Sequence, residues 1–232
     1  MAKLNLEILA YEETPLGPIC LRRRELLSQP GVVITEVTLN HEFLMSSLYT
    51  DSEQALSRIA IEMHGGEQLQ VMVAGLGLGY TAFEALQYDR VANVEVIELL
   101  PQVIGWMKDG LPPLASQLSG DSRLEVTQAD AYARLAGDSE KQYDLILIDV
   151  DHSPDDRLGA GESFTFYSSE GLMAAKRHLR PGGVLGVWSY AESSPFADAL
   201  KASFKTVRVE PITHQNELIN EEHTDWLFFA SD

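Results

Sequence analysis

Residues 69–79 read LQVMVAGLGLG, an apolar run that ends in three closely spaced glycines. The run has the length of a buried strand, and the stretch after it, to about residue 88, has the pattern of a helix. Glycines at such a turn let a ligand approach the backbone closely. Tyr80 stands where a dinucleotide-binding loop has its last glycine, so the loop does not match that pattern. It is not a P-loop either, because no Gly-Lys-Ser/Thr follows. Two interpretations stay open here: a nucleoside-binding turn, and a turn that uses glycine for packing alone.

The alternation of apolar runs and helical stretches continues after this loop. A helix is expected to open at Pro101, and another near residues 166–179 is expected to stop at the Pro-Gly-Gly of residues 181–183. Two last strands, joined by a polar loop that holds Glu221, Glu222 and Asp225, are expected at the end of the chain. The expected strands after the glycine loop are residues 94–97, 124–127, 145–148, 184–188, 206–209 and 226–230. This order predicts βαβ units and an α/β fold with a mostly parallel sheet covered by helices on both faces.

The first 50 residues have a different pattern. Short runs at residues 4–9, 19–23 and 32–39 lie between turn formers and predict a few hairpin-linked strands. A helix capped by Asp51 or Ser52 follows. We therefore expect two parts, a small N-terminal β region over residues 1–50 and an α/β domain over residues 51–232.

The amino-acid composition limits the classes of ligand and metal site that the chain can have. Of the 232 residues, 17 are Lys or Arg and 35 are Asp or Glu, so the formal charge is −18. Such a charge repels nucleic acid and anionic membranes, so neither is expected as a partner, and a neutral or cationic small molecule fits better. Cys20 is the only cysteine, which excludes an internal disulfide and a cysteine-based zinc site. No apolar run has the length of a signal peptide or a membrane span, so the expected location is the cytoplasm.

Acidic residues stand where successive predicted strands end, and ligands of parallel sheets bind at that edge. Glu98 comes 23 residues after Gly75, a spacing that suits a carboxylate on ribose hydroxyls. Asp130, followed by Ala131, could contact a base or cap a helix. Asp149 and Asp151 could hold a cationic amine or act as a base. No further ligand has a convincing spacing, so no metal site is predicted.

Several of these stretches, in this order, resemble the polyamine aminopropyltransferase (spermidine synthase-like) family, within the class I S-adenosylmethionine (SAM)-dependent methyltransferases. The likeness extends over residues 50–210, approximately. The stretches that carry it are VAGLGLG at 73–79, VEVIE at 94–98 with Val103-Ile104, Asp130-Ala131, YDLILID at 143–149, Phe166-Tyr167 leading to LRPGG at 179–183, and residues 188–196.

The resemblance implies a Rossmann-like fold with a seven-stranded sheet that binds SAM or decarboxylated SAM as the donor substrate. It places the nucleoside among Glu98, Asp130, Ala131 and the three glycines Gly75, Gly77 and Gly79. It makes Asp149 the group that helps deprotonate the attacking amine. Asp151, two residues further on in the loop, is expected from its position mainly to tune Asp149. A homodimer is also expected from the likeness, with the N-terminal strands as its natural interface.

Three positions depart from the family pattern. Leu78 stands where the family's glycine loop usually has an aspartate that helps to hold the aminopropyl donor, and residues 51–53 read Asp-Ser-Glu where the family has Tyr-His-Glu. His152 stands where the family has its second aspartate. Because Leu78 removes a charge that would repel the SAM carboxylate, these departures favour full SAM as donor unless Asp51 or Glu53 replaces the missing acid.

The sequence thus predicts a transferase that moves an alkyl group of aminopropyl type from a sulfonium to an amine or similar small nucleophile. Two alternatives remain open at this point: a SAM-dependent small-molecule methyltransferase, and a nucleoside-binding protein without catalysis.

Overall fold

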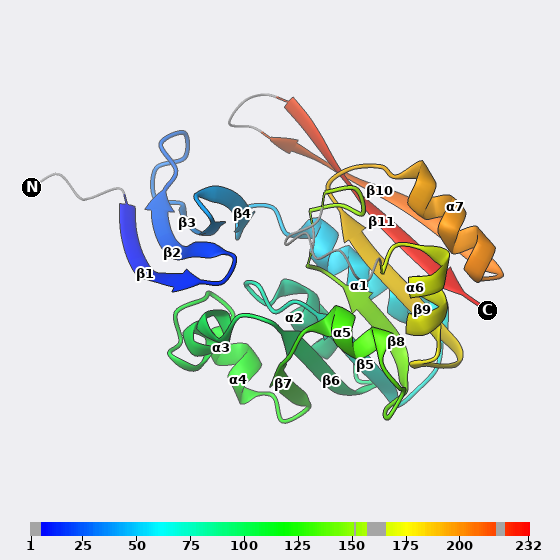
Figure 1. The fold of residues 1–232 in the computed structure, drawn as a ribbon. Coiled ribbons are helices and arrows are strands. Elements are labelled where there is room, and N and C mark those ends of the chain that lie inside the picture. Colours follow the sequence, from blue (N-terminus) through cyan, green and yellow to red (C-terminus); the bar gives the residue numbers. More distant parts are fainter. Residues whose placement is uncertain (1–5, 151, 157–165, 217–220) are drawn as a thin grey trace, which may run out of the picture.

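The computed structural model describes residues 6–150, 152–156, 166–216 and 221–232. These residues form two sheets that lie side by side, a four-stranded sheet near the N-terminus and a larger seven-stranded sheet (Figure 1).

The larger sheet has the order β10-β11-β9-β8-β5-β6-β7. The five strands from β9 to β7 are parallel, β11 is antiparallel to β9, and β10 is antiparallel to β11. This confirms the predicted mostly parallel seven-stranded sheet. Successive strands run outward from β5 in one direction and from β8 in the other, so the chain reverses its order between these two central strands. The strand bounds are β5 Leu69–Ala74, β6 Val91–Glu98, β7 Leu124–Gln128, β8 Tyr143–Ile148, β9 Leu179–Ser189, β10 Thr206–Asn216 and β11 Glu221–Ser231.

Helices cover both faces of this sheet, because alternate apolar residues of the central strands point to opposite sides. Val71 and Val73 pack with α1 to α4, whereas Met72 and Ala74 pack with α5 to α7. Gly65, in the left-handed conformation, ends α1, and Pro101 opens α3 as predicted. The helix bounds are α1 Asp51–His64, α2 Tyr80–Leu86, α3 Pro101–Lys108, α4 Ala115–Gly120, α5 Ala131–Ala136, α6 Ser169–Lys176 and α7 Ser194–Ser203.

The N-terminal sheet is an antiparallel meander, β1-β2-β3-β4. Its strands are β1 Leu6–Thr14, β2 Gly17–Glu25, β3 Val33–Leu39 and β4 Glu42–Ser46. Ile19, Leu21, Val37 and Leu39 belong to the same buried cluster as helices α1 to α4. One face of the small sheet therefore packs against the helical layer of the larger one, and the small sheet lies beside the glycine loop (Figure 1).

The structure corrects several local expectations. Strand β4 was not predicted, and α6 ends at Lys176, so the Pro-Gly-Gly of residues 181–183 lies inside β9 instead of stopping a helix. Thr50 is the N-cap of α1, so the prediction of Asp51 or Ser52 is wrong. The Thr50 side chain makes no capping hydrogen bond. The polar stretch near the C-terminus is mostly strand, because β10 and β11 pair from Thr206 with Ser231 out to Asn216 with Glu221.

None of the helices in the described part of the chain combines the length and the apolar character that crossing a membrane needs.

Candidate active site

The glycine loop lies between β5 and α2, against the end of β8. Gly75 has a φ of 94°, and a Cβ atom there would lie 2.2 Å from the backbone oxygen of Asp149. Only glycine tolerates both this backbone conformation and this approach. Gly75 therefore lets the loop touch the residue that follows β8, which brings two of the predicted site segments into contact.

A cavity of about 310 Å³ opens at the carboxyl ends of β5, β6 and β7. Five of the six residues predicted to bind the nucleoside line it, namely Gly75, Gly77, Glu98, Asp130 and Ala131. The sixth, Gly79, lines a second cavity on the other side of the loop. Leu99, Leu100, Ala129 and Tyr132 add apolar and aromatic surface to the first cavity, which suits a base and a sugar.

Glu98 and Asp130 also have structural partners. Glu98 is buried, and its carboxylate accepts from the backbone N–H of Leu76 at 2.9 Å and of Leu100 at 2.7 Å. Burial raises the pKa of Glu98, and these backbone donors oppose the shift. Asp130 accepts from the N–H groups of Tyr132 and Ala133 and so caps α5. The capping role is confirmed, and the ligand-binding role of both acids stays a prediction.

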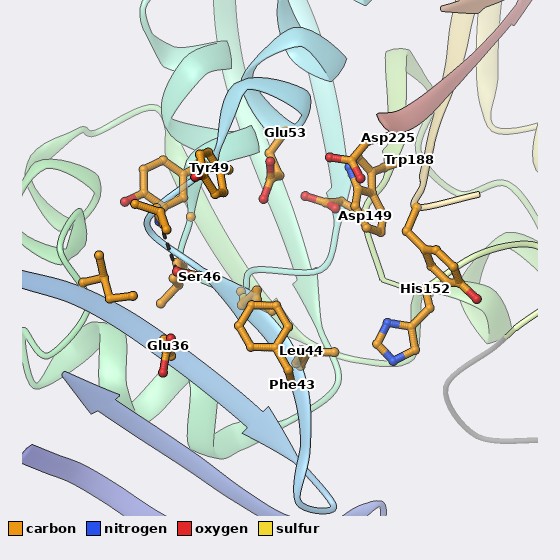
Figure 2. Close-up of a pocket in the computed structure, with 18 of the residues that line it drawn as sticks. Glu36, Phe43, Leu44, Ser46, Tyr49, Glu53, Asp149, His152, Trp188 and Asp225 are labelled. Atoms are coloured by element: carbon orange, nitrogen blue, oxygen red, sulfur yellow. Dashed lines mark hydrogen bonds between the residues drawn. The ribbon is translucent and has the colours of Figure 1, made fainter. Parts of the chain in front are cut away.

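The second cavity, of about 540 Å³, lies between the glycine loop and the N-terminal sheet. Four carboxylates line it. Glu36 of β3 forms ion pairs with Arg22 and Arg24. The other three come from different elements: Glu53 from α1, Asp149 from just after β8 and Asp225 from β11. Figure 2 shows these three side chains pointing toward one another. Asp225 is 6% exposed, so the prediction that it lies in a solvated loop is wrong, although Glu221 and Glu222 are exposed. Asp151 lies outside the described residues.

Electrostatic coupling joins the three carboxylates. Burial and the charge of Asp149 raise the pKa of Glu53 to about 8. Burial and the charge of Asp225 raise the pKa of Asp149 to about 6, against a hydrogen bond from Thr81 that lowers it. Like charges held this close disfavour full ionisation. A cation in the cavity would relieve the repulsion, whereas another anion would increase it.

Ser52 connects two of the carboxylates to the cavity wall. Its hydroxyl lies 2.7 Å from Asp225 Oδ2 and 2.9 Å from Glu53 Oε2, and it accepts from the indole N–H of Trp188 at 3.0 Å. A hydroxyl has one proton, so it can donate to only one of the two acids at a time. Each acid also has a second partner: a backbone N–H donates to Glu53, and Nε2 of His223 lies 3.3 Å from Oδ1 of Asp225.

Aromatic side chains surround the carboxylates. Tyr49, Tyr80, Trp188 and Tyr190 line the cavity. Rings around an acidic centre are a favourable setting for an ammonium or a sulfonium. In the described part of the chain, no group of three or more His, Cys, Asp or Glu side chains has an arrangement that could hold a metal ion.

The two cavities meet at one place. Leu44, Met45, Gly77, Asp149 and Val150 line both of them. Asp149 is the only one of these five residues with an ionisable side chain. The arrangement offers two ligand spaces whose common wall carries one carboxylate.

Comparisons with known proteins agree with this geometry. The family model described as the spermine/spermidine synthase domain matches residues 25–224. The chain belongs to the spermine/spermidine synthase family. A polyamine aminopropyltransferase of Prochlorococcus marinus (strain MIT 9313) is 34% identical over 120 residues, which cover 52% of this chain and 40% of the relative. Putrescine N-methyltransferase 2 of Nicotiana tabacum is 28% identical over 124 residues, 53% of this chain and 33% of the relative. The chain thus spans less than half the length of these curated relatives.

A solved structure within the family has the same fold. The spermidine synthase from Thermotoga maritima superposes with a TM-score of 0.74 at 17% sequence identity, covering 97% of this chain and 72% of the other. The Rossmann-like fold expected from the family resemblance is thereby confirmed.

The sequence identified only some of the residues that line the second cavity. Glu53 was considered only as a replacement for the acid missing from the glycine loop; the structure places it in the cavity, whereas Asp51 is exposed. Leu78, 3% exposed, lines the same cavity. Asp225 was missed. Its only signal is its place just before the apolar run WLFFA of residues 226–230.

Proposed function

We propose that the chain transfers an aminopropyl group from decarboxylated SAM to a small cationic amine. The observation that carries this proposal is the meeting of the two cavities at Asp149, with Glu53 and Asp225 beside it. The 310 Å³ cavity would hold the nucleoside of the donor, and the 540 Å³ cavity the acceptor amine. Membership of the spermine/spermidine synthase family supports the same activity.

Asp149 would act as the base. The acceptor arrives as an ammonium and must lose a proton before its nitrogen can attack. The raised pKa of Asp149, about 6, makes this carboxylate a stronger base than an exposed aspartate while leaving it ionised at neutral pH. The free amine then attacks the carbon next to the sulfonium. The new C–N bond forms as the C–S bond breaks. The electron pair of the C–S bond stays on the sulfur, so the sulfonium becomes a neutral thioether.

The choice of donor follows from charge. Full SAM would bring its carboxylate toward the cavity that already holds Glu53, Asp149 and Asp225. Decarboxylated SAM lacks this group and ends in an amine, which the three acids attract. The acids thus compensate for the aspartate that Leu78 replaces, and they favour the decarboxylated donor over the SAM that Leu78 by itself suggested.

Methyl transfer from SAM to the same kind of amine is the second candidate. It is favoured by Leu78, which leaves the glycine loop without an acid, and by the similarity to a protein named putrescine N-methyltransferase 2. The two candidates differ only in the donor and share the roles of Asp149 and of the acceptor cavity.

The experiment incubates the purified chain with putrescine and either donor and identifies the product by mass spectrometry. An aminopropylated diamine made from decarboxylated SAM supports the first candidate, and a methylated diamine made from SAM supports the second. Asp149→Asn should lower turnover by about 10²–10⁴-fold, the range for a lost proton-transfer group, while methylthioadenosine binding by calorimetry stays within about twofold. No product from either donor would overturn both candidates and leave a nucleoside-binding role.

The assembly and the location stay predictions. We propose a homodimer that uses the N-terminal sheet, where Leu6, Ile8 and Tyr11 of β1 are exposed, and an intracellular, cytoplasmic site of action, in keeping with a small-molecule substrate and a single cysteine.

A further inference from the structure

Thr81 makes the closest polar contact of the proposed base. Its hydroxyl oxygen lies 2.5 Å from Oδ2 of Asp149. Thr81 is the second residue of α2 and is 3% exposed. The contact links the helix that follows the glycine loop to the residue that follows β8.

The surroundings of this contact hold both partners in place. The backbone oxygen of Thr81 accepts from the Ser57 hydroxyl at 2.6 Å, which fixes the start of α2 against α1. The backbone N–H of Asp149 donates to Ala74 O at 2.9 Å, which fixes that residue to β5. Among the described residues, no other side chain donates to the Asp149 carboxylate. Oδ1 of Asp149 is therefore the oxygen left to meet a substrate at the wall between the two cavities.

We propose that Thr81 is a positioning residue, whose hydroxyl holds Oδ2 of Asp149 so that Oδ1 faces the acceptor and the carboxylate stays ionised as a base. This proposal rests on the proposed function, in which Asp149 accepts the proton of the amine. Thr81 itself touches neither the donor nor the acceptor in this assignment.

The physical reason is the balance of effects on Asp149. Burial and the charge of Asp225 raise the pKa of Asp149, and the hydroxyl of Thr81 is the group that lowers it. A hydroxyl that donates to a carboxylate stabilises the ionised form. Without this donor, Asp149 would hold its proton at neutral pH and could not take another one from the amine.

The test compares Thr81→Val, which removes the hydroxyl at nearly constant shape, with Thr81→Ser, which keeps it. In Thr81→Val, the pH at which kcat falls on the acid side of its pH profile should rise by about one to two units. This is the range expected for a lost hydrogen bond to a charged group. The rate should recover toward the wild-type value at high pH, and methylthioadenosine affinity should not change. Thr81→Ser should restore the acid limb to within a few tenths of a unit.

Ser57→Ala is the matched control, because it removes a buried hydroxyl from the same helix contact without touching Asp149. Its acid limb should stay where the wild type has it. A shift in Ser57→Ala equal to that in Thr81→Val would mean that packing of α2 is responsible, and would overturn the proposal.

A second measurement does not depend on turnover. NMR titration of ¹³C-labelled aspartate carboxyls, with Asp149 assigned by its loss in Asp149→Asn, reports the pKa of this group in each variant. An upward shift in Thr81→Val and none in Thr81→Ser supports the positioning role even if the proposed reaction fails. An unchanged Asp149 titration in Thr81→Val overturns it even if the wild type is active.

Discussion

Gly75 joins the glycine loop to the residue that follows β8, because its backbone meets the backbone oxygen of Asp149. The glycine run indicated a tight turn at the edge of the sheet, and in the structure Gly75 meets the backbone of Asp149 in a conformation that side chains rarely adopt. The sequence could not name the contact itself, because residue 149 lies 74 positions further along the chain and only the parallel pairing of β5 with β8 brings the two together.

We expect Gly75→Ala to destabilise the chain more than Gly182→Ala does. Both glycines have a left-handed φ, 94° and 79°, but a Cβ atom at Gly182 would meet nothing within 4 Å. The control therefore measures backbone strain alone, about 1–2 kcal/mol, and Gly75→Ala adds the clash with Asp149 O. Urea denaturation should give a free energy of unfolding at least about 1 kcal/mol lower for Gly75→Ala than for Gly182→Ala. Equal losses would show that the loop shifts freely and that its contact with Asp149 is not needed.

At the scale of elements, strand β11 contributes more to the site than its sequence indicated. Residues 213–225 are mostly polar and have no apolar alternation, so they resembled a loop. Residues 213–216 and 221–225 extend the two strands, because backbone bonds between β10 and β11 do not depend on apolar side chains. Asp225 lines the acceptor cavity. It pairs with Ile212 of β10 and directly precedes Trp226, the residue at which β11 begins to pair with β9. The central strands, by contrast, were predictable because burial on both faces makes them continuously apolar.

Asp225→Asn should weaken acceptor binding while leaving the donor in place. Loss of one charge near the ammonium should raise the KM of putrescine by about 10- to 100-fold, from about 1.5–3 kcal/mol for a charge-assisted contact. Because Asp225 raises the pKa of Asp149, the acid limb of kcat should move to lower pH, opposite to the change expected in Thr81→Val. Steady-state kinetics across pH measures both effects.

Glu222→Gln is the control for this change, since Glu222 is an exposed acid on the same strand. If its KM rises as much as that of Asp225→Asn, the general negative charge of the chain, and not the site, attracts the amine.

At the scale of the whole molecule, the two sheets share their interior. One buried cluster contains Ile19 and Val37 of the N-terminal sheet together with Leu56 of α1 and Val73 of β5. The division into residues 1–50 and 51–232 thus stays a proposal about sequence regions, since the core runs through both. The acceptor cavity depends on the same packing, because Phe43 and Leu44 of β4 line it together with residues of α1, of β11 and of the segment after β8.

The acidic cluster should make the stability of the whole chain depend on pH. Glu53 and Asp149 take up protons on folding, because their pKa values rise from 4.5 to about 8 and from 3.8 to about 6. The folded state then binds more protons than the unfolded state between about pH 4 and pH 8, so this contribution lowers stability as pH rises. The cost is absent below the unfolded values and complete above about pH 8.

Glu53→Gln removes the group with the larger shift. Because the burial of a charge and its repulsion by Asp149 are both relieved, Tm at pH 8 should rise by about 2–4 °C for each kcal/mol of this cost, and should change little at pH 5. Thermal melts of both proteins at the two pH values measure the difference, with Glu62→Gln, an exposed acid on the same helix, as the control. A Tm gain in Glu53→Gln that is equal at both pH values, or one that Glu62→Gln reproduces, would show that burial and neighbouring charge do not raise the pKa of Glu53. The charge argument for a cationic acceptor and a decarboxylated donor would then lose its basis.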